Sequence, residues 1–354
     1  MAVDLGGTNF RVCSIQLHGN TTFSLTQSKV AIPRELMVAK TSKELFSFLA
    51  QQIAKFLQTH HGEHYHATIR RRATVSQESG FQEEEIFNLG FTFSFPVQQV
   101  GINKGTLIRW TKGFDIDDAV GKDVCKLLQD EIDLLHLPVR VAALVNDTVG
   151  TLMARSYTSP GKTGTLLGAI FGTGTNGAYV EKLDKVKKLD ANSEEGKNVD
   201  RTTGEMIINT EWGSFDNHLS VLPNTPYDAS LDKETPNPGF QMFEKRISGM
   251  FLGEILRLAI VDLIKERKTG LFSDENSSSN DVHSTTCLAD ESPLWQPWGL
   301  DTSFLSIAHG DNSAGFKVTR QTLDKDYGVH AASSEDAEAV KLIAAAIEIG
   351  RAHV

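Results

Sequence analysis

The chain has few cysteines and no long apolar run, and each absence excludes a class of protein. Cysteine occurs three times in 354 residues, at the distant positions Cys13, Cys125 and Cys287. An odd number of widely spaced cysteines does not make a disulfide framework or a zinc site, and it indicates a reducing compartment. No apolar stretch approaches the roughly 20 residues that cross a bilayer, and Asp4 interrupts the start before a signal-peptide pattern can form. We therefore expect a cytoplasmic protein that makes no use of a membrane.

The chain also lacks an excess of positive charge. Lys and Arg number 35 against 45 Asp and Glu, which gives a formal net charge of −10. This balance argues against direct binding of nucleic acid or of an anionic membrane. Hydrophobic residues make up 40% of the chain, enough for a sizeable core. About 150 residues per domain predicts two domains in a chain of this length.

Strand and helix patterns are mixed along the chain, which predicts an α/β fold with a domain break near residue 146. Short apolar or alternating runs predict strands at residues 1–5, 10–17, 22–30, 88–95, 139–145 and 166–171. Helical spacing of apolar residues predicts helices at about residues 41–56, 124–135, 240–265 and 337–347. Polar and charged composition predicts exposed loops at residues 60–86, 184–204 and 270–300.

A glycine pair between the first two predicted strands is the first candidate site. It lies in the sequence Asp4-Leu-Gly-Gly-Thr-Asn-Phe-Arg11. The pair alone favours a tight β-turn, because glycine is the usual residue at positive φ. The added Thr, Asn and Arg favour a phosphate-binding turn, in which exposed backbone N–H groups hold phosphate oxygens. A carboxylate such as Asp4 is suited to hold a hydrated Mg²⁺.

A second glycine-rich turn spans residues 172–177. Its sequence Gly172-Thr-Gly-Thr-Asn-Gly177 matches the dinucleotide pattern G-x-G-x-x-G letter for letter. A Rossmann site requires a helix to begin at this point, whereas residues 178–180 continue as a strand. The strand–turn–strand context therefore predicts a second phosphate-binding turn.

Asn146-Asp147 follows a predicted strand and precedes a helical segment. An Asp at this position fits two roles. One is the N-cap of the helix, which is the favoured interpretation for an isolated residue. The other is a general base that accepts a proton from a hydroxyl.

Several polar residues interrupt otherwise apolar stretches. Each alone fits a solvated or capping group, but together they match the hydroxyls of a polyol, which must be hydrogen-bonded when buried. They are Ser94, Thr111, Lys112, Glu211 and Glu244.

Two weaker patterns occur near residue 70. The cluster His60, His61, His64 and His66 matches no known metal-ligand spacing, and a solvated loop is the favoured interpretation over a metal site. The sequence Arg71-Arg-Ala-Thr74 is typical of a site for a basic-directed protein kinase, and Thr74 phosphorylation is a regulatory hypothesis.

The order of the motifs resembles that of the eukaryotic hexokinases, in particular the fungal hexokinases and hexokinase-like proteins. The resemblance runs through residues 4–12, 89–96, 107–115, 141–153, 168–181, 208–217 and 222–243. It implies an actin-like, RNase H-like ATPase fold of two α/β domains around a cleft. It also implies ATP-dependent, Mg²⁺-assisted phosphorylation of glucose and related hexoses at the 6-hydroxyl.

The resemblance implies a role for each matching residue. Asp147 is the expected catalytic base, with Lys112 neutralising the transferring phosphoryl group. The sugar-binding residues are Ser94, Thr111, Lys112, Asn146, Asp147, Asn176, Glu211 and Glu244. The ATP-binding residues are Asp4, Gly6, Gly7, Thr8, Asn9, Arg11, Thr173 and Gly174, of which Asp4 holds the metal through water.

The family continues beyond the last residues of this chain, which stops within the helical pattern at 337–347. We therefore expect residues 1–145 to form the small domain, with a polar insertion near 60–86, and residues 146–354 to form a truncated, incomplete large domain. Two alternatives remain. One is a catalytically weak, sugar-sensing regulator with regulatory protein partners and a nuclear fraction. The other is an actin-like ATPase or assembly protein, which would need no polyol site.

Overall fold

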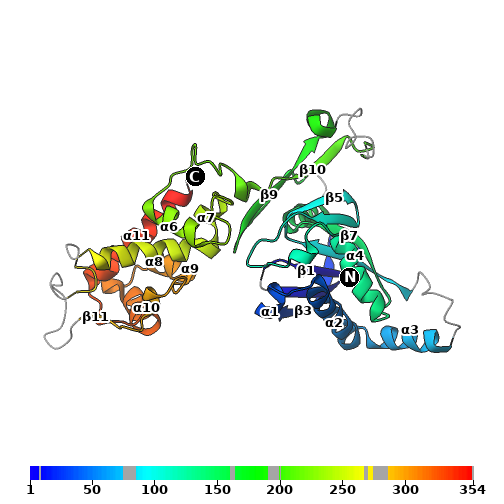
Figure 1. The fold of residues 1–354 in the computed structure, drawn as a ribbon, viewed down its shortest axis with the longest axis horizontal. Coiled ribbons are helices and arrows are strands. Elements are labelled where there is room, and N and C mark those ends of the chain that lie inside the picture. The colour runs from blue at the N-terminus through cyan, green and yellow to red at the C-terminus, as the bar shows by residue number, and fades with distance from the viewer. Residues whose placement is uncertain are drawn as a thin grey trace. The chain divides into compact units, whose positions relative to one another are not determined.

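The computed structural model of the chain describes residues 1–7, 9–74, 85–159, 164–189, 199, 201–266, 270–273 and 286–352, and the side chains of 72–74 and 349–352 lie outside this description. The chain divides into two compact units. The first holds Met1–Ala169 with Gly177–Asn209, and the second holds Ile170–Asn176 with Thr210–Val354 (Figure 1). This division is into compact units and does not test the expected domain boundary between residues 145 and 146, which stays a prediction.

A mixed β-sheet forms the centre of the first unit. Its strands, in sheet order, are β3 (Phe23–Ala31), β2 (Asn9–Leu17), β1 (Ala2–Leu5), β4 (Phe87–Phe93) and β7 (Val139–Val145). β1 is antiparallel to β2 and parallel to β4, and β4 is parallel to β7. Leu5 is level with Phe93, and Thr92 is level with Val145. The carboxyl ends of β1, β4 and β7 therefore meet at one edge of the sheet.

Helices cover this sheet because they carry apolar residues on one face. The helices of this unit are α1 (Arg34–Met37), α2 (Ser42–His60), α3 (Gly62–Thr74), α4 (Val124–Leu134) and α5 (Asp147–Thr158), of which α1 and α3 contact α2. α2 packs on β2, α4 packs on β7, and the two helices pack on each other. Leu45, Leu49 and Ile53, at the predicted helical spacing, are fully buried on α2.

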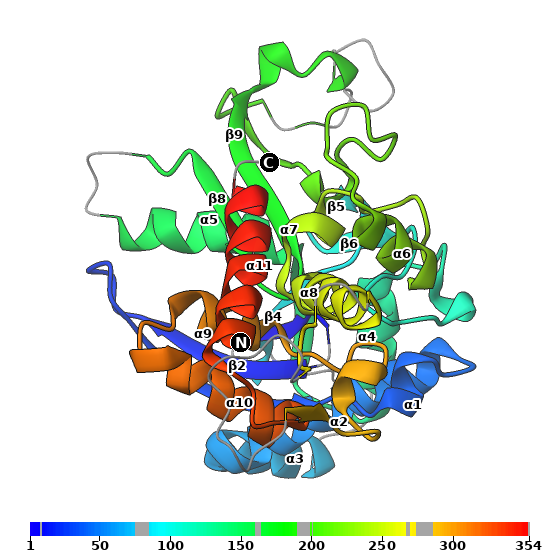
Figure 2. The ribbon, with the colours of Figure 1, turned by 90° about the vertical axis from the view of Figure 1, so that its left-hand side faces the viewer.

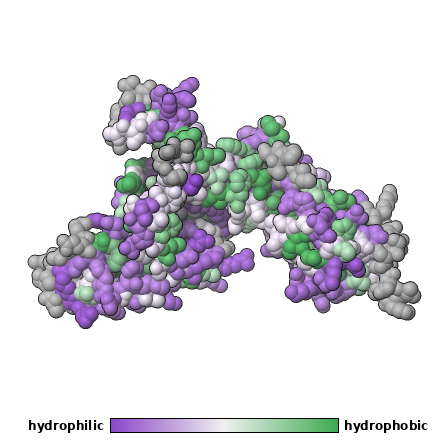
Figure 3. Space-filling model, turned by 180° about the vertical axis from the view of Figure 1, so that it is seen from behind, coloured by the Kyte–Doolittle hydropathy of each residue, from purple (hydrophilic) through white to green (hydrophobic). Residues whose placement is uncertain are grey.

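The predicted exposed loop at residues 60–86 is wrong for its first part, where α3 forms. The segment is polar, but Glu, Ala and Arg are strong helix formers, and polar composition does not exclude a helix on the surface. Tyr65 and Thr68 turn toward the core, while Figure 3 has mostly hydrophilic residues over α3. Arg71 forms an ion pair with Glu85, which ties α3 to the start of β4. Residues 75–84 and the side chain of Thr74 lie outside the described residues.

Shorter elements complete the first unit and connect it to the second. They are β5 (Val97–Gly101), β6 (Lys104–Leu107), η2 (Asp117–Ala119), β8 (Leu167–Phe171), β9 (Thr175–Lys182), η3 (Leu183–Lys185), η4 (Lys187–Leu189) and β10 (Glu205–Asn209). β9 pairs with β8 on one side and with β10 on the other. β8, the turn and β9 confirm the strand–turn–strand context predicted around residues 172–177. The predicted loop at 184–204 begins with the short helical turns η3 and η4 and ends as a turn before β10.

The second unit is mainly helical in its described part. Its elements are η5 (Trp212–Ser214), α6 (Pro226–Glu234), α7 (Glu244–Ile247), α8 (Gly249–Lys265), β11 (Cys287–Leu288), η7 (Pro293–Trp295), α9 (Thr302–Gly310), η8 (Ala314–Phe316), α10 (Lys317–Tyr327), β12 (Val329–His330) and α11 (Ser334–Ala352). α9 packs against both α8 and α11, and α11 also packs against α8, which Figure 2 shows nearly end-on next to the upright α11. Their shared core includes the fully buried Leu256, Ile260 and Val340. Within the described ranges, no helix has the combined length and apolar character that a membrane crossing requires.

The helix predicted over residues 240–265 is broken in two. Ser248 has an extended backbone, with φ −96° and ψ 153°, so α7 ends before it and α8 begins after it. Serine at such a position favours a helix start over a helix interior. The break has a structural use, because the first N–H groups of α8 bind the glycine-rich turn described below.

Candidate active site

The carboxyl ends of β1, β4 and β7 bring three predicted site segments together. Gly6 follows β1, Ser94 follows β4 and Asn146 follows β7. The backbone N–H of Ser94 donates to the carbonyl of Leu5 at 3.1 Å, which joins the first two segments. Ligand sites in open α/β sheets lie at this kind of edge, outside the carboxyl ends of parallel strands. The edge is therefore the candidate active site of the first unit.

Ser94 lies at the centre of this edge. Its side chain is 5% exposed, and its Oγ is buried with no hydrogen-bond partner in the described structure. A β-carbon placed on Gly6 would lie 2.9 Å from that oxygen. A buried hydroxyl without a partner carries a desolvation cost of about 1–3 kcal/mol. An incoming ligand with a polar group would remove this cost.

Lys112 reaches the same point from the loop after β6. Its Nζ donates to the backbone carbonyl of Ser94 at 2.9 Å and lies 5.7 Å from the ring centroid of Phe95. Lys112 has a positive φ of 58°, an uncommon backbone conformation for a residue with a side chain. Trp110 anchors the loop, because its ring stacks on Phe114 and its indole N–H donates to the protein backbone. Lys112 is thereby held in a fixed position.

Two roles, helix N-cap and general base, were considered for Asp147 in the Asn146-Asp147 motif. The N-cap of α5 is Asn146, whose Oδ1 accepts from the backbone N–H of Thr148 at 2.9 Å. Asp147 is the first residue of the helix, and its Oδ1 accepts from the same N–H at 2.7 Å and from the Thr148 hydroxyl at 3.2 Å. The capping role predicted for an isolated Asp147 is therefore carried by its neighbour. A carboxylate held at a helix N-terminus by two donors has a defined orientation.

Asp4 and Arg11 face each other across the β1–β2 pair. Arg11 Nη1 lies 3.3 Å from Asp4 Oδ2. Burial is the main cause that raises the pKa of Asp4, and the negative charge of Asp147 raises it further. The positive charges of Arg11 and Lys112 lower this pKa, but they do not cancel the rise. These charges therefore act on one another at the same edge of the sheet. A partly buried carboxylate with a raised pKa is a group that a cation would stabilise in its charged form.

The remaining predicted residues of the first unit take less defined positions. Gly7 is buried and has a φ of 93°, which fits the turn predicted there. Asn9 is the first residue of β2, and Thr8 lies outside the described residues. Thr111 is half-buried, and its carbonyl accepts from the backbone N–H of Phe114 at 3.2 Å.

The second unit holds the other three predicted sugar-binding residues around the turn between β8 and β9. Asn176 Nδ2 donates to Glu211 Oε1 at 3.3 Å. The backbone N–H of Thr175 donates to Glu244 Oε2 at 2.9 Å. Glu211 has a φ of 48° and precedes η5, so a sharp turn presents its carboxylate. Two carboxylates and an amide of this unit are therefore gathered at one glycine-rich turn.

The start of α8 fixes this turn. The N–H groups of Gly249 and Met250 donate to the carbonyls of Gly172 and Thr173 at 2.8 and 3.1 Å, and Gly172 N–H donates to Gly174 O at 2.9 Å. Thr173 is exposed and Gly174 is half-buried. The turn predicted to bind phosphate is thus closed on itself and fastened to a helix N-terminus.

Sequence reasoning missed the residues that support this cluster. Trp212 donates from Nε1 to the hydroxyl of Thr175 at 2.9 Å, and Gln241 Nε2 donates to Glu244 Oε1 at 3.4 Å. The spacing of Gln241 and Glu244, three residues apart before a helix, was the one signal in the sequence that could have suggested the second contact.

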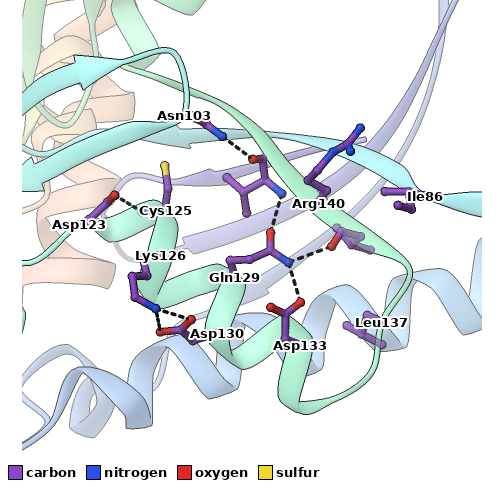
Figure 4. A pocket seen from close by; sticks show the side chains of 12 residues that line it. Ile86, Asn103, Asp123, Cys125, Lys126, Gln129, Asp130, Asp133, Leu137 and Arg140 are labelled. Atoms are coloured by element: carbon purple, nitrogen blue, oxygen red, sulfur yellow. Dashed lines mark hydrogen bonds and ion pairs between the residues drawn. The ribbon is translucent and has the colours of Figure 1, made fainter. Parts of the chain in front are cut away.

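Two other features lie away from these residues. A cavity of about 520 Å³ lies at the outer edge of β7, lined by residues of α4 such as Cys125 and Gln129 (Figure 4). Around the histidine cluster, His61 lies 5.3 Å from the ring of Phe87, and burial lowers the pKa of His61. In the described part of the chain, no three histidine, cysteine or carboxylate residues form a group that could hold a metal ion.

Comparison with known proteins gives consistent matches over nearly the whole chain. Two hexokinase family models match residues 1–157 and 166–353. The chain is 60% identical to a glucokinase of Aspergillus niger over 98% of its own length and 68% of that protein. It is 41% identical to Glucokinase-1 of Saccharomyces cerevisiae over 98% of its own length and 66% of that protein. A hexokinase of Schistosoma mansoni, solved with glucose, matches with a TM-score of 0.77 and 34% identity over 99% of this chain and 68% of that one.

The structural match shows the fold class, which is the two-domain, actin-like ATPase fold of α/β type. The chain spans about two thirds of the length of the curated relatives it matches. At this identity and coverage, the chain belongs to the hexokinase family. These relatives are glucokinases and hexokinases, which does not favour the regulator alternative.

Proposed function

We propose that this protein phosphorylates a hexose at its 6-hydroxyl, with ATP as the phosphoryl donor. The reaction breaks the bond between the γ-phosphorus and the bridging oxygen of ATP and forms a bond to the sugar oxygen. Phosphoryl transfer of this kind depends mainly on positioning and on neutralising charge. The observation that carries the proposal is the gathering of Ser94, Lys112 and Asp147 at the carboxyl edge of the sheet.

Asp147 is the proposed catalytic base. It takes the proton of the 6-hydroxyl as the sugar oxygen attacks the γ-phosphorus. Two donors of Thr148 orient one of its oxygens, and an oriented base contributes about 10²–10⁴-fold to the rate. Lys112, fixed by the carbonyl of Ser94, supplies positive charge toward the transferring phosphoryl group.

Besides the catalytic base, we propose several other side chains as hydrogen-bond partners of the sugar hydroxyls. In the first unit these are Ser94, Thr111, Lys112, Asn146 and Asp147, and in the second they are Asn176, Glu211 and Glu244. Carboxylates and amides suit this role because each hydroxyl donates one hydrogen bond and accepts others. A hexose that lacks one of these hydroxyls would leave a buried polar group unpaired and would be rejected.

The two glycine-rich turns are the proposed ATP-phosphate sites. The first comprises Gly6, Gly7, Thr8, Asn9 and Arg11, and the second comprises Thr173 and Gly174. The raised pKa of the partly buried Asp4 fits a role as water-mediated partner of Mg²⁺. The ion would supply charge neutralisation of the ATP phosphates. We further propose a cytoplasmic location for the protein.

The test is a coupled glucose-phosphorylation assay beside calorimetric glucose binding. We expect both binding and ATP-dependent turnover. Binding without turnover would contradict the catalytic proposal and support a sugar sensor. Loss of both, in a protein that melts cooperatively, would contradict the hexose site itself.

A further inference from the structure

We infer that Gln241 is a positioning residue that holds the carboxylate of Glu244 in place for the hexose. The inference rests on the proposed role of Glu244 in binding a sugar hydroxyl. Gln241 itself does not need to touch the sugar. It acts through hydrogen bonds that connect η5 to α7 within the second unit.

Each of the two oxygens of Glu244 accepts a hydrogen bond from a different residue. Oε2 accepts from the backbone N–H of Thr175 at 2.9 Å, and Oε1 accepts from Gln241 Nε2 at 3.4 Å. A carboxylate held at both oxygens cannot rotate freely about its terminal bond. Orientation of this kind lets a ligand bind without first ordering the side chain.

The direction of the Gln241 amide is also fixed. Its Oε1 is hydrogen-bonded to the hydroxyl of Ser214, which lies in η5. A carboxylate accepts hydrogen bonds and cannot donate them, so the NH₂ group of Gln241 must face Glu244. Ser214 therefore fixes the orientation of the Gln241 amide, and this amide fixes the orientation of the Glu244 carboxylate.

The backbone around Gln241 supports the same arrangement. Gln241 is 8% exposed, and its φ is 56°, a conformation that side-chain-bearing residues seldom adopt. Gly213 allows the close approach, because a β-carbon there would lie 3.1 Å from Gln241 Nε2 and 3.1 Å from Glu244 Cβ. Such strain persists where surrounding contacts fix it, which is common at functional sites.

The neighbouring charged side chains do not substitute for Gln241. Lys245 Nζ pairs with Asp232 at 2.6 Å, and Arg246 Nε donates to the carbonyl of Pro223 at 2.7 Å. Across the glycine-rich turn, Glu211 accepts from Asn176. Lys245 and Arg246 are thus hydrogen-bonded to groups other than the Glu244 carboxylate, and Lys245 also acts on Glu244 through its charge.

The test replaces Gln241 by Glu and follows glucose affinity by calorimetry between pH 6 and pH 9. Two carboxyl groups this close share a proton, and one pKa of the pair is strongly raised. A protonated Glu at position 241 still donates to Glu244, whereas a charged one repels it. We expect Gln241→Glu to bind glucose within about twofold of the wild type at pH 6 and at least tenfold more weakly at pH 9. A tenfold change corresponds to about 1.4 kcal/mol.

Two further variants separate positioning from a general loss of structure. Gln241→Met removes the donor at similar size, and we expect a weaker affinity that does not vary more with pH than the wild type. Ser214→Ala frees the amide, and we expect a smaller loss of about two- to fivefold. KM for glucose should rise in each variant more than kcat falls, and KM for ATP should change little.

Each outcome decides the inference. A loss in Gln241→Glu that is the same at every pH, or no loss in Gln241→Met, would overturn it. If Gln241→Glu does not fold, the Gln241→Met and Ser214→Ala affinities decide alone, with wild-type affinity in both as the contrary result. Absence of glucose binding in the wild type would instead count against the proposed function.

Discussion

A β-carbon added to Gly6 would lie 2.9 Å from the Oγ of Ser94 and 3.2 Å from its Cβ. Such distances do not occur between unstrained atoms, so one of the two residues must move. Gly6 follows β1 and Ser94 follows β4, in neighbouring parallel strands whose register fixes both backbones. The absence of a side chain at Gly6 is therefore what allows the Ser94 hydroxyl to occupy its position.

Gly6→Ala is expected to displace Ser94 and to weaken glucose binding by about tenfold, with a loss of about 1–3 kcal/mol in the free energy of unfolding from overpacking. Gly310→Ala is the control, because a β-carbon there meets nothing within 4 Å. Calorimetry and thermal melting measure the two effects. An unchanged affinity in Gly6→Ala would remove Ser94 from the sugar site.

Asp147→Asn is expected to reduce turnover by about 10²–10⁴-fold and to leave glucose binding detectable, because Asn keeps an oxygen for Thr148 but cannot take a proton at neutral pH. The measurement is the coupled phosphorylation assay beside calorimetry. Asp130→Asn serves as the control, since Asp130 lies on the exposed face of α4 and pairs with Lys126. Turnover near the wild-type level in Asp147→Asn would refute the base assignment.

The sequence predicted the five strands of the central sheet, β1, β2, β3, β4 and β7, because apolar or alternating runs there lie between turn residues, but it did not predict the more polar β5, β6 and β10. The predicted strand at 139–145 coincides with β7, and Asn146 and Asp147 follow it as expected. The sequence could not predict the break at Ser248, because the start of α8 is fixed by tertiary hydrogen bonds to the glycine-rich turn, which local pattern does not encode. The spacing of Gln241 and Glu244 is local, but the hydrogen bond of Gln241 to Ser214 in η5 is tertiary and could not be predicted either.

Gln129 closes the outer edge of the sheet. Its Nε2 donates to the carbonyl of Val139 at 3.1 Å, and its Oε1 accepts from the N–H of Val141 at 2.8 Å, as a neighbouring strand would (Figure 4). Gln129→Ala would leave both backbone groups of β7 open, and an open edge favours pairing with another chain. We expect a loss of about 1–3 kcal/mol in the free energy of unfolding and increased self-association.

Urea unfolding and light scattering measure these two effects of Gln129→Ala. Lys126→Ala is the matched control on the same helix, because the exposed ion pair of Lys126 with Asp130 contributes little to stability. Equal stability and equal scattering in the two variants would mean that water serves the edge of β7 as well as the Gln129 amide does.

Because of Asp311, we expect the stability of the second unit to vary with pH in the acidic range. Burial opposes its ionisation, but hydrogen bonds from Ser313 and Thr319 prevail and hold its pKa at about 2, below the ordinary 3.8. Backbone and hydroxyl groups of both residues donate to its two oxygens, between α9 and α10. A carboxylate with a depressed pKa stabilises the folded state above its unfolded pKa and stops doing so as pH falls through its folded pKa.

The Asp311 contribution is therefore expected to be complete above pH 4 and to disappear between about pH 4 and pH 2. Asp311→Asn should be less stable than the wild type at pH 7, and the difference should shrink across this window. Urea unfolding followed by circular dichroism at pH 7, 4, 3 and 2 gives the comparison, with the exposed Asp130→Asn as control. A difference between wild type and Asp311→Asn that stays constant from pH 7 to pH 2 would show that packing, and not charge, is what the substitution removes.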